Sequence, residues 1–280
     1  MIILSIIIPA NSRSETLVRA VSSIFKQCVN NVEVIITLRD GDIDTLHVLD
    51  EIKSKFGDKV KLLIINKPMN STDDWNDGLS IASGKYLMLL EGDDYLPPNC
   101  LDEFRNAIDI YENLSLYVMA TDSFTFKLDG YIYSSTFLKR LRTLKEVPPP
   151  SQTIFINANG FYKSSLYEYA PEIDFYYELI SKTKLPIFVN NDVKVYREPS
   201  LDRYKGLKWK HFKDHYQFVS SHVHDYSFSQ LIKVLFSLKF RCVTKIIVTL
   251  KNSLNTDKEL IFNTFSFFKD FSIFLKWFKR

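Results

Sequence analysis

The chain has 280 residues, enough for one large domain or one domain with a smaller appendage. It is 46% apolar and 25% charged, which is typical of a globular protein and excludes a disordered or membrane-embedded one. Its three cysteines fit no metal-ligand or redox spacing. Without a signal peptide or an apolar run of about 18 residues, we expect a protein of the reducing cytoplasm.

The net charge of +3 is unevenly distributed along the chain. Residues 206–280 contain 13 Lys and Arg but only five Asp and Glu, whereas residues 1–205 contain 23 and 28. This asymmetry predicts that the two parts face different partners.

The first third of the chain alternates apolar runs with helical periodicity, the pattern of a parallel sheet covered by helices. Residues 12–15 form a possible capping box before the first helix, and Gly57 closes the second helix. We expect strands at 2–8, 33–38, 60–65 and 85–90, with helical stripes at 17–28, 46–56 and 71–82.

Beyond residue 100 the pattern becomes mixed. We expect a helix at 100–114, a strand at 116–120 and a hairpin turn at Asp129-Gly130. Residues 163–181 are expected to be helical, and 187–189 and 193–196 to form two short strands.

Polar turns follow three of the predicted strands: residues 9–12 (PANS), 39–42 (RDGD) and 91–94 (EGDD). In an open parallel sheet, ligands bind outside the carboxyl ends of the strands. We therefore expect the three turns to line one crevice. The first turn lacks the glycine-rich phosphate loops of ATPases and dinucleotide-binding proteins.

The last turn places Glu91, Asp93 and Asp94 within four positions, directly after a strongly apolar strand. Like charges at this spacing repel one another and resist burial. A divalent cation would resolve the repulsion, and Mg²⁺ and Mn²⁺ prefer such oxygen ligands. The alternative is a solvated acidic turn.

Four segments together resemble the family 2 glycosyltransferases of GT-A fold: residues 5–11 (SIIIPAN), Asp40-Gly41, residues 75–86 (WNDGLSIASGKY) and residues 91–94. The resemblance covers residues 1 to about 120 well and about 120–200 weakly. It implies an α/β fold with a Rossmann-like, mostly parallel sheet. It also implies a metal-dependent inverting transferase that uses a nucleoside-diphosphate sugar, most simply a UDP-sugar.

The resemblance also assigns site residues. It implies that the acidic turn binds Mn²⁺ or Mg²⁺ on the donor diphosphate, with Asp94 and Asp93 as metal ligands. The donor nucleotide would be bound by Pro9, Ala10, Asn11, Asp40, Asn76, Glu91, Gly92 and Asp93. Two departures stand out: the family usually has Asp where this chain has Glu91, and two adjacent Asp residues where it has Arg39-Asp40.

An inverting transfer needs a general base that takes the proton of the acceptor hydroxyl. The resemblance implies an Asp at the start of a later helix, and Asp174 in residues 172–179 (EIDFYYEL) fits best. Ile173 interrupts the family's usual Glu-Asp pair, and Glu172 and Glu178 are possible substitutes. The alternative is that Asp174 only caps the helix.

Other polar and aromatic residues have simpler interpretations. His211, His215, His222 and His224 are more typical of surface or acceptor-side positions than of metal ligands, although some GT-A enzymes use a late histidine. Trp75 is expected in the core. Arg197 lies near a loop that covers the site in the family, or forms a surface ion pair.

The C-terminal part, 206–280, lies outside the resemblance. Apolar residues at three- and four-residue steps alternate with basic ones over 228–280, which predicts a basic amphipathic extension. Either this extension lies on an anionic membrane at its cytoplasmic face, or it packs on the catalytic domain or a second subunit. No nucleic-acid module is recognisable.

We therefore expect a GT-A domain at 1–205, with a nucleotide-sugar half (1–120) and an acceptor half (121–205), followed by the helical extension at 206–280. The acceptor would be a glycan or a lipid-linked glycan, with bacterial surface polysaccharide as the setting. Two alternatives are a nucleotidyltransferase, which would need a glycine-rich basic loop at residues 9–12, and a non-catalytic GT-A-like assembly protein that binds nucleotide or membrane.

Overall fold

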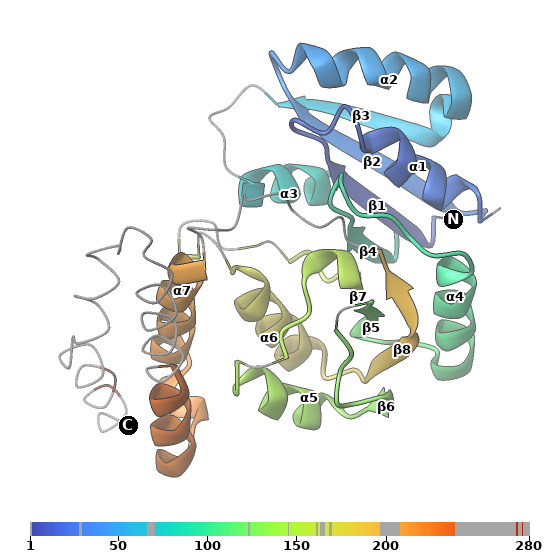
Figure 1. Cartoon of the computed structure of the whole chain (residues 1–280). Coiled ribbons are helices and arrows are strands. Elements are labelled where there is room, and N and C mark those ends of the chain that lie inside the picture. Colours follow the sequence, from blue (N-terminus) through green and yellow to red (C-terminus); the bar gives the residue numbers. More distant parts are fainter. Residues whose placement is uncertain are drawn as a thin grey trace.

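The computed structural model describes residues 2–27, 30–65, 71–122, 124–144, 146–160, 162, 166–167, 170–196, 208–238, 273 and 276. Within these residues, eight strands form one mixed sheet in the order β3-β2-β1-β4-β7-β5-β8-β6 (Figure 1). The strands are β1 (Leu4–Pro9), β2 (Val32–Arg39), β3 (Val60–Ile65), β4 (Tyr86–Leu89), β5 (Leu116–Thr121), β6 (Gly130–Ile132), β7 (Thr153–Ile156) and β8 (Ile187–Val195).

The first four strands are parallel to one another, as the sequence pattern predicts. β7 is antiparallel to both β4 and β5, and β6 is antiparallel to β8. Parallel pairing returns between β5 and β8. The sheet is therefore a parallel half extended by a mixed half, and β4 lies at the junction.

Helices cover both faces of the sheet (Figure 1). They are α1 (Leu17–Phe25), α2 (Ile43–Phe56), α3 (Ser71–Ser80), α4 (Cys100–Tyr111), α5 (Ser134–Leu141), α6 (Glu172–Thr183) and α7 (Lys208–Ser221), with short 3-10 turns η1 (Gly57–Lys59), η2 (Pro150–Gln152) and η3 (Val223–Asp225). Residues 228–238 are also helical.

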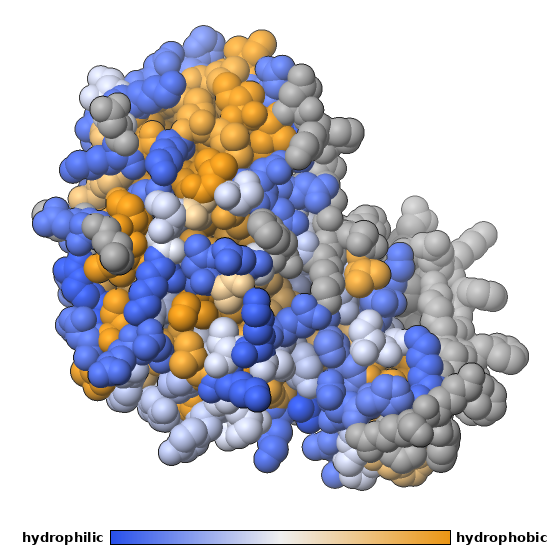
Figure 2. All heavy atoms as spheres, turned by 180° about the vertical axis from the view of Figure 1, so that it is seen from behind, coloured by the Kyte–Doolittle hydropathy of each residue, from blue (hydrophilic) through white to orange (hydrophobic). Residues whose placement is uncertain are grey.

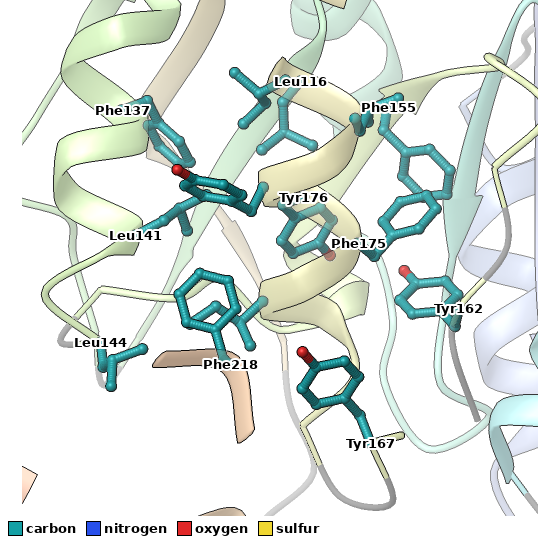
Figure 3. Packing of buried hydrophobic residues seen from close by; sticks show 14 of the residues in the cluster. Leu116, Phe137, Leu141, Leu144, Phe155, Tyr162, Tyr167, Phe175, Tyr176 and Phe218 are labelled. Carbon is teal, nitrogen blue, oxygen red and sulfur yellow. The ribbon is translucent and has the colours of Figure 1, made fainter. Parts of the chain in front are cut away.

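Alternation along the strands divides the buried residues into two clusters. Ile7 of β1 packs in one cluster with residues of α3, α5, α6 and α7, whereas Ile6 and Ile8 pack in the other with α1, α2 and α4. Successive strand residues point to opposite faces, so a strand covered on both sides must be apolar throughout. Figure 3 shows the first cluster around α6.

Several local predictions differ from the structure. The predicted capping box is wrong, because α1 begins only at Leu17 and Thr16 makes no side-chain cap. The predicted hairpin turn is also wrong: Gly130, with a φ of 71°, begins β6, which pairs with β8 rather than with the preceding segment. The two short strands expected at 187–196 form the single strand β8.

The described part of the C-terminal region packs against α5 and α6. Phe218 and Val219 of α7 are buried in the same cluster as residues of α5 and α6, and Leu231 and Leu238 of the following helix join them. None of the helices in the described residues is long and apolar enough to span a bilayer. The predicted boundary at 205 lies outside the described residues.

The edge strand β3 presents apolar side chains at the surface. Figure 2, the view from behind, shows apolar residues gathered at the top of the molecule, where Figure 1 places β2 and β3. Ile64 near the end of β3 is 51% exposed. The site described next lies at the carboxyl ends of these strands.

Candidate active site

Asn11, Arg39 and Asp74 form a polar cluster at the carboxyl ends of β1 and β2. Asn11 Nδ2 donates to Asp74 Oδ2 over 2.8 Å, and Asn11 Oδ1 accepts the Arg39 backbone N–H over 2.8 Å. The Arg39 guanidinium is paired with the other oxygen of Asp74 over 2.5 Å. Burial raises the pKa of Asp74, and the nearby Arg39 opposes this shift. The cluster joins both strands to the first turn of α3.

Asn11 lies at the edge of the sheet predicted from the sequence, whereas Asp74 was not among the predicted site residues. A signal was available: where the family usually has two adjacent Asp residues, this chain has Arg39 first. A cation introduced into a buried site needs a nearby carboxylate, because an unpaired buried charge is costly. Asp74, in the first turn of α3, supplies that carboxylate.

The rest of the first two turns is held mainly by backbone bonds. The Ala10 N–H donates to the carbonyl of Thr37, and Ala10 is buried. Asp40 is exposed beyond the end of β2. Asp42 accepts a 2.7 Å bond from the Ser12 N–H and also caps α2 at Thr45. Burial raises the pKa of Asp42, but these bonds outweigh it and the net shift is downward.

The acidic turn after β4 is held closely against the turn after β1. Thr16 Oγ1 donates to the carbonyl of Gly92 over 2.7 Å. A Cβ added at Gly92 would lie 2.9 Å from the carbonyl oxygen of Pro9, so a larger residue would push the two turns apart. The Asp93 carboxylate is paired with Arg13 over 3.2 Å, and Asp94 is buried.

These contacts bear on whether the turn suits a metal ion. Among the residues the structure describes, no group of three or more His, Cys, Asp or Glu side chains forms a metal cage. However, Mg²⁺ is commonly held by one or two carboxylates together with substrate phosphates and water. The adjacent carboxylates of Asp93 and Asp94 fit that donor set, with Arg13 offsetting part of the charge.

Asn76 links α3 to the segment after β7. Its side-chain Oδ1 accepts the Tyr162 N–H over 2.8 Å, and its Nδ2 donates to the Tyr162 carbonyl over 2.9 Å. Both ends of the amide therefore bind backbone, and contact with a donor nucleotide stays a prediction. Trp75 is buried and meets the Tyr162 ring edge-on, in agreement with the predicted core position.

Asp174 lies in the first turn of α6 and is only 2% exposed. Its Oδ1 accepts the Tyr167 hydroxyl over 3.0 Å and lies 2.8 Å from His222 Nε2. The cap alternative is wrong, because α6 begins at Glu172 after Pro171 and has no side-chain cap. Its role as general base stays a prediction.

Of the candidate histidines, His222 contacts Asp174 rather than the acidic turn. His215 is partly buried in α7 and His224 is exposed in η3. The His211 side chain and all of Arg197 lie outside the described residues.

Residues 5–169 match the family described as Glycosyl transferase family 2, so the chain belongs to this family. It is 30% identical over 142 residues to a chondroitin synthase of Escherichia coli, covering 48% of this chain and 19% of that protein. It is 35% identical over 107 residues to a hyaluronan synthase of Pasteurella multocida, covering 36% and 11%. The matches thus span less than a third of these relatives.

Solved structures show the same fold at low identity. S. aureus TarS 1-349 in complex with UDP superposes with a TM-score of 0.66 at 13% identity, covering 92% of this chain and 77% of that chain. Mannosyltransferase PcManGT from Pyrobaculum calidifontis, in complex with GDP-Man and Mn²⁺, gives 0.60 at 11% identity, covering 98% and 86%. The chain therefore has the GT-A fold expected from its sequence.

Proposed function

We propose that this protein transfers a sugar from a nucleoside-diphosphate sugar, a UDP-sugar in the first instance, to a hydroxyl group of a glycan or lipid-linked acceptor, with inversion at the anomeric carbon. The observation that carries the proposal is the meeting of the acidic turn 91–94 with the turn after β1. Similar folds in complex with UDP, UDP-GlcNAc and GDP-Man support a nucleotide-sugar donor.

The donor would lie along the carboxyl ends of β1, β2 and β4. In this arrangement, residues 9–11, Asp40 and Asn76 lie on the nucleotide side, and Glu91, Gly92 and Asp93 lie beside the sugar diphosphate. Asp94, with Asp93, would hold Mg²⁺ or Mn²⁺. When bound, this ion would stabilise negative charge on the departing diphosphate. The acceptor would enter from residues 121–205, where α6 supplies the base.

A calorimetric panel of UDP, GDP, dTDP and CMP, each with and without Mn²⁺, tests the proposal. We expect one diphosphate to bind, and to bind more tightly with Mn²⁺. If none binds to the folded protein, the non-catalytic alternative, a GT-A-like assembly protein, is the better account. Turnover is then checked as release of nucleoside diphosphate from the sugar nucleotide that bound.

We also propose that the protein works at the inner face of a bacterial membrane, in surface polysaccharide synthesis. The helix at 228–238 buries Leu231, Val234, Leu235 and Leu238 but leaves an exposed apolar stripe. The stripe consists of Phe228, Ile232 and Phe236, which are 45%, 43% and 71% exposed. Residues four apart share a helix face, and the region 206–280 carries an excess of basic residues.

Sedimentation with phosphatidylglycerol vesicles tests this membrane contact. Phe236→Ser should lower the bound fraction about threefold, because it removes the most exposed ring of the stripe. Ile110→Ser, an equally exposed site on α4, is the matched control and should have no effect. Equal binding of Phe236→Ser and the unaltered protein would contradict this contact.

A further inference from the structure

The first turn of α6 carries two acidic side chains that point to opposite sides. A helix turns by about 100° per residue, so residues two apart are separated by about 200°. Glu172 and Asp174 therefore cannot both face the crevice beside β4. The neighbours of each face show which one does.

The face that carries Asp174 is turned towards α7 and is closed. Two partners of the Asp174 carboxylate, Tyr167 and His222, lie on this side. Tyr177, three residues after Asp174, brings its ring to 4.6 Å from His222, and Phe218 of α7 lies 4.7 Å from the same imidazole. His222 Nδ1 also lies 3.6 Å from Asp225. An acceptor hydroxyl would have to displace these groups to reach Asp174.

The face that carries Glu172 is turned towards the sheet. Tyr176, one turn after Glu172, places its hydroxyl 2.7 Å from Thr153 Oγ1 at the start of β7. Two residues before Thr153, the Ser151 hydroxyl accepts the Glu91 backbone N–H over 3.0 Å. The side of α6 that bears Glu172 thus leads to the acidic turn after β4.

Tyr162 provides a second link between Glu172 and the crevice. Its ring stacks on Phe175 at 4.2 Å, on the side of α6 away from Phe218 (Figure 3). Its backbone is bound by Asn76, as described above. Burial raises the pKa of Tyr162 most, and the nearby charges of Glu172 and Glu91 raise it further. Glu172 is partly exposed, unlike Asp174.

We propose that Glu172 is the general base of the transfer and that Asp174 is a positioning residue, which joins α6 to α7 through His222. In the reaction, Glu172 takes the proton of the acceptor hydroxyl while that oxygen forms a bond to the anomeric carbon. The bond between this carbon and the diphosphate oxygen breaks, and the diphosphate leaves with the electron pair. This inference rests on the proposed function.

The test compares Glu172→Gln, Asp174→Asn, His222→Gln and the control Glu103→Gln, which changes an exposed carboxylate on α4. UDP release from UDP-GlcNAc, or GDP release from GDP-mannose if that donor binds, is measured across pH, with water or an added saccharide as acceptor. Donor affinity and melting temperature are measured for each variant.

For Glu172→Gln we expect kcat to fall at least about 100-fold, with donor affinity within about twofold and the acidic limb of the pH profile lost. Asp174→Asn and His222→Gln should lower kcat about tenfold or less and lower the melting temperature, with the acidic limb retained. Their double variant should be no worse than the poorer single variant, because both break one contact. The turnover of Glu103→Gln should be unchanged.

Near-normal turnover in Glu172→Gln, together with loss of the acidic limb in Asp174→Asn, would overturn the inference and return the base to Asp174. If Asp174→Asn does not fold, His222→Gln carries the comparison, since it leaves the carboxylate in place. If the unaltered protein binds no nucleotide sugar, the proposed function itself fails, which is a different outcome from failure of any variant.

Discussion

The two ends of the central strands both hold buried carboxylates, but the chain satisfies them differently. At the amino end, Glu33 accepts bonds from the Ser5 hydroxyl, from the Ser83 N–H and hydroxyl, and from Lys61 Nζ. Burial raises the pKa of Glu33, but the bonds from Lys61, Ser5 and Ser83 outweigh it and lower the pKa to about 2.

At the carboxyl end, the carboxylates outnumber the arginines paired with them. Asp74 has Arg39 and Asn11 as partners, yet burial still raises its pKa. Nearby, residues 91–94 add three carboxylates, with Arg13 paired to Asp93. One end is therefore a closed structural network, while the other has a charge balance that suits a cation and a ligand. Sites of function commonly give up stability in this way.

The largest effect should come from the charged end. If Asp94 holds the metal as proposed, Asp94→Asn is expected to lower kcat/KM about 100-fold and to abolish the Mn²⁺ dependence of nucleotide binding, because the variant lacks the proposed ligand oxygen. The melting temperature should stay close to that of the unaltered protein. Calorimetry with and without Mn²⁺ measures the metal dependence of nucleotide binding. Asp102→Asn, an exposed site on α4, is the control; metal-dependent binding that survives in Asp94→Asn would remove Asp94 from the metal site.

Arg39→Met should cost about 3 kcal/mol of unfolding free energy, because it leaves Asp74 buried without its cation. Asp74 has a raised pKa in the folded state, so stability falls as pH rises through and above the ordinary Asp value. The loss in Arg39→Met should therefore be greater at pH 8 than at pH 5 in urea unfolding. The double variant Arg39→Met/Asp74→Asn should recover most of the lost free energy of unfolding. No recovery would mean that Asp74 does not cause the loss.

The amino end should respond in stability alone. Glu33→Gln is expected to cost about 2 kcal/mol, a modest figure because Lys61 is half exposed and its pairing is screened. The lowered pKa of Glu33 stabilises the fold above pH 4.5, and this contribution is lost as pH falls towards 2. In acid unfolding experiments, the free energy of unfolding of Glu33→Gln should therefore depend less on pH in this range than that of the unaltered protein. Glu51→Gln, exposed on α2, is the control. Altered donor affinity in folded Glu33→Gln would break the contrast between the two ends.

The sequence alone was enough to predict that the first four strands are parallel, that the three turns lie at one edge of the sheet, and that the chain belongs to its family. These features are local: continuous apolar runs indicate strands buried on both faces, helical periodicity indicates helices, and the acidic turn is a stretch of four residues. Gly57 was also predicted correctly as the end of α2, where its φ is 59°. The pairing of the second half was not, because β7 and β6 are short and their partners are distant in the chain.

Only the tertiary structure decided which polar residues meet. Arg39 and Asp74 are 35 residues apart, Asn11 and Asp74 are 63 apart, and Asp174 and His222 are 48 apart. No periodicity along the chain encodes such pairs, because they depend on how strands and helices are packed after the chain has turned back several times. The sequence could therefore locate the acidic edge of the sheet, whereas the direction of each carboxylate on α6 required the packing of α7 against it.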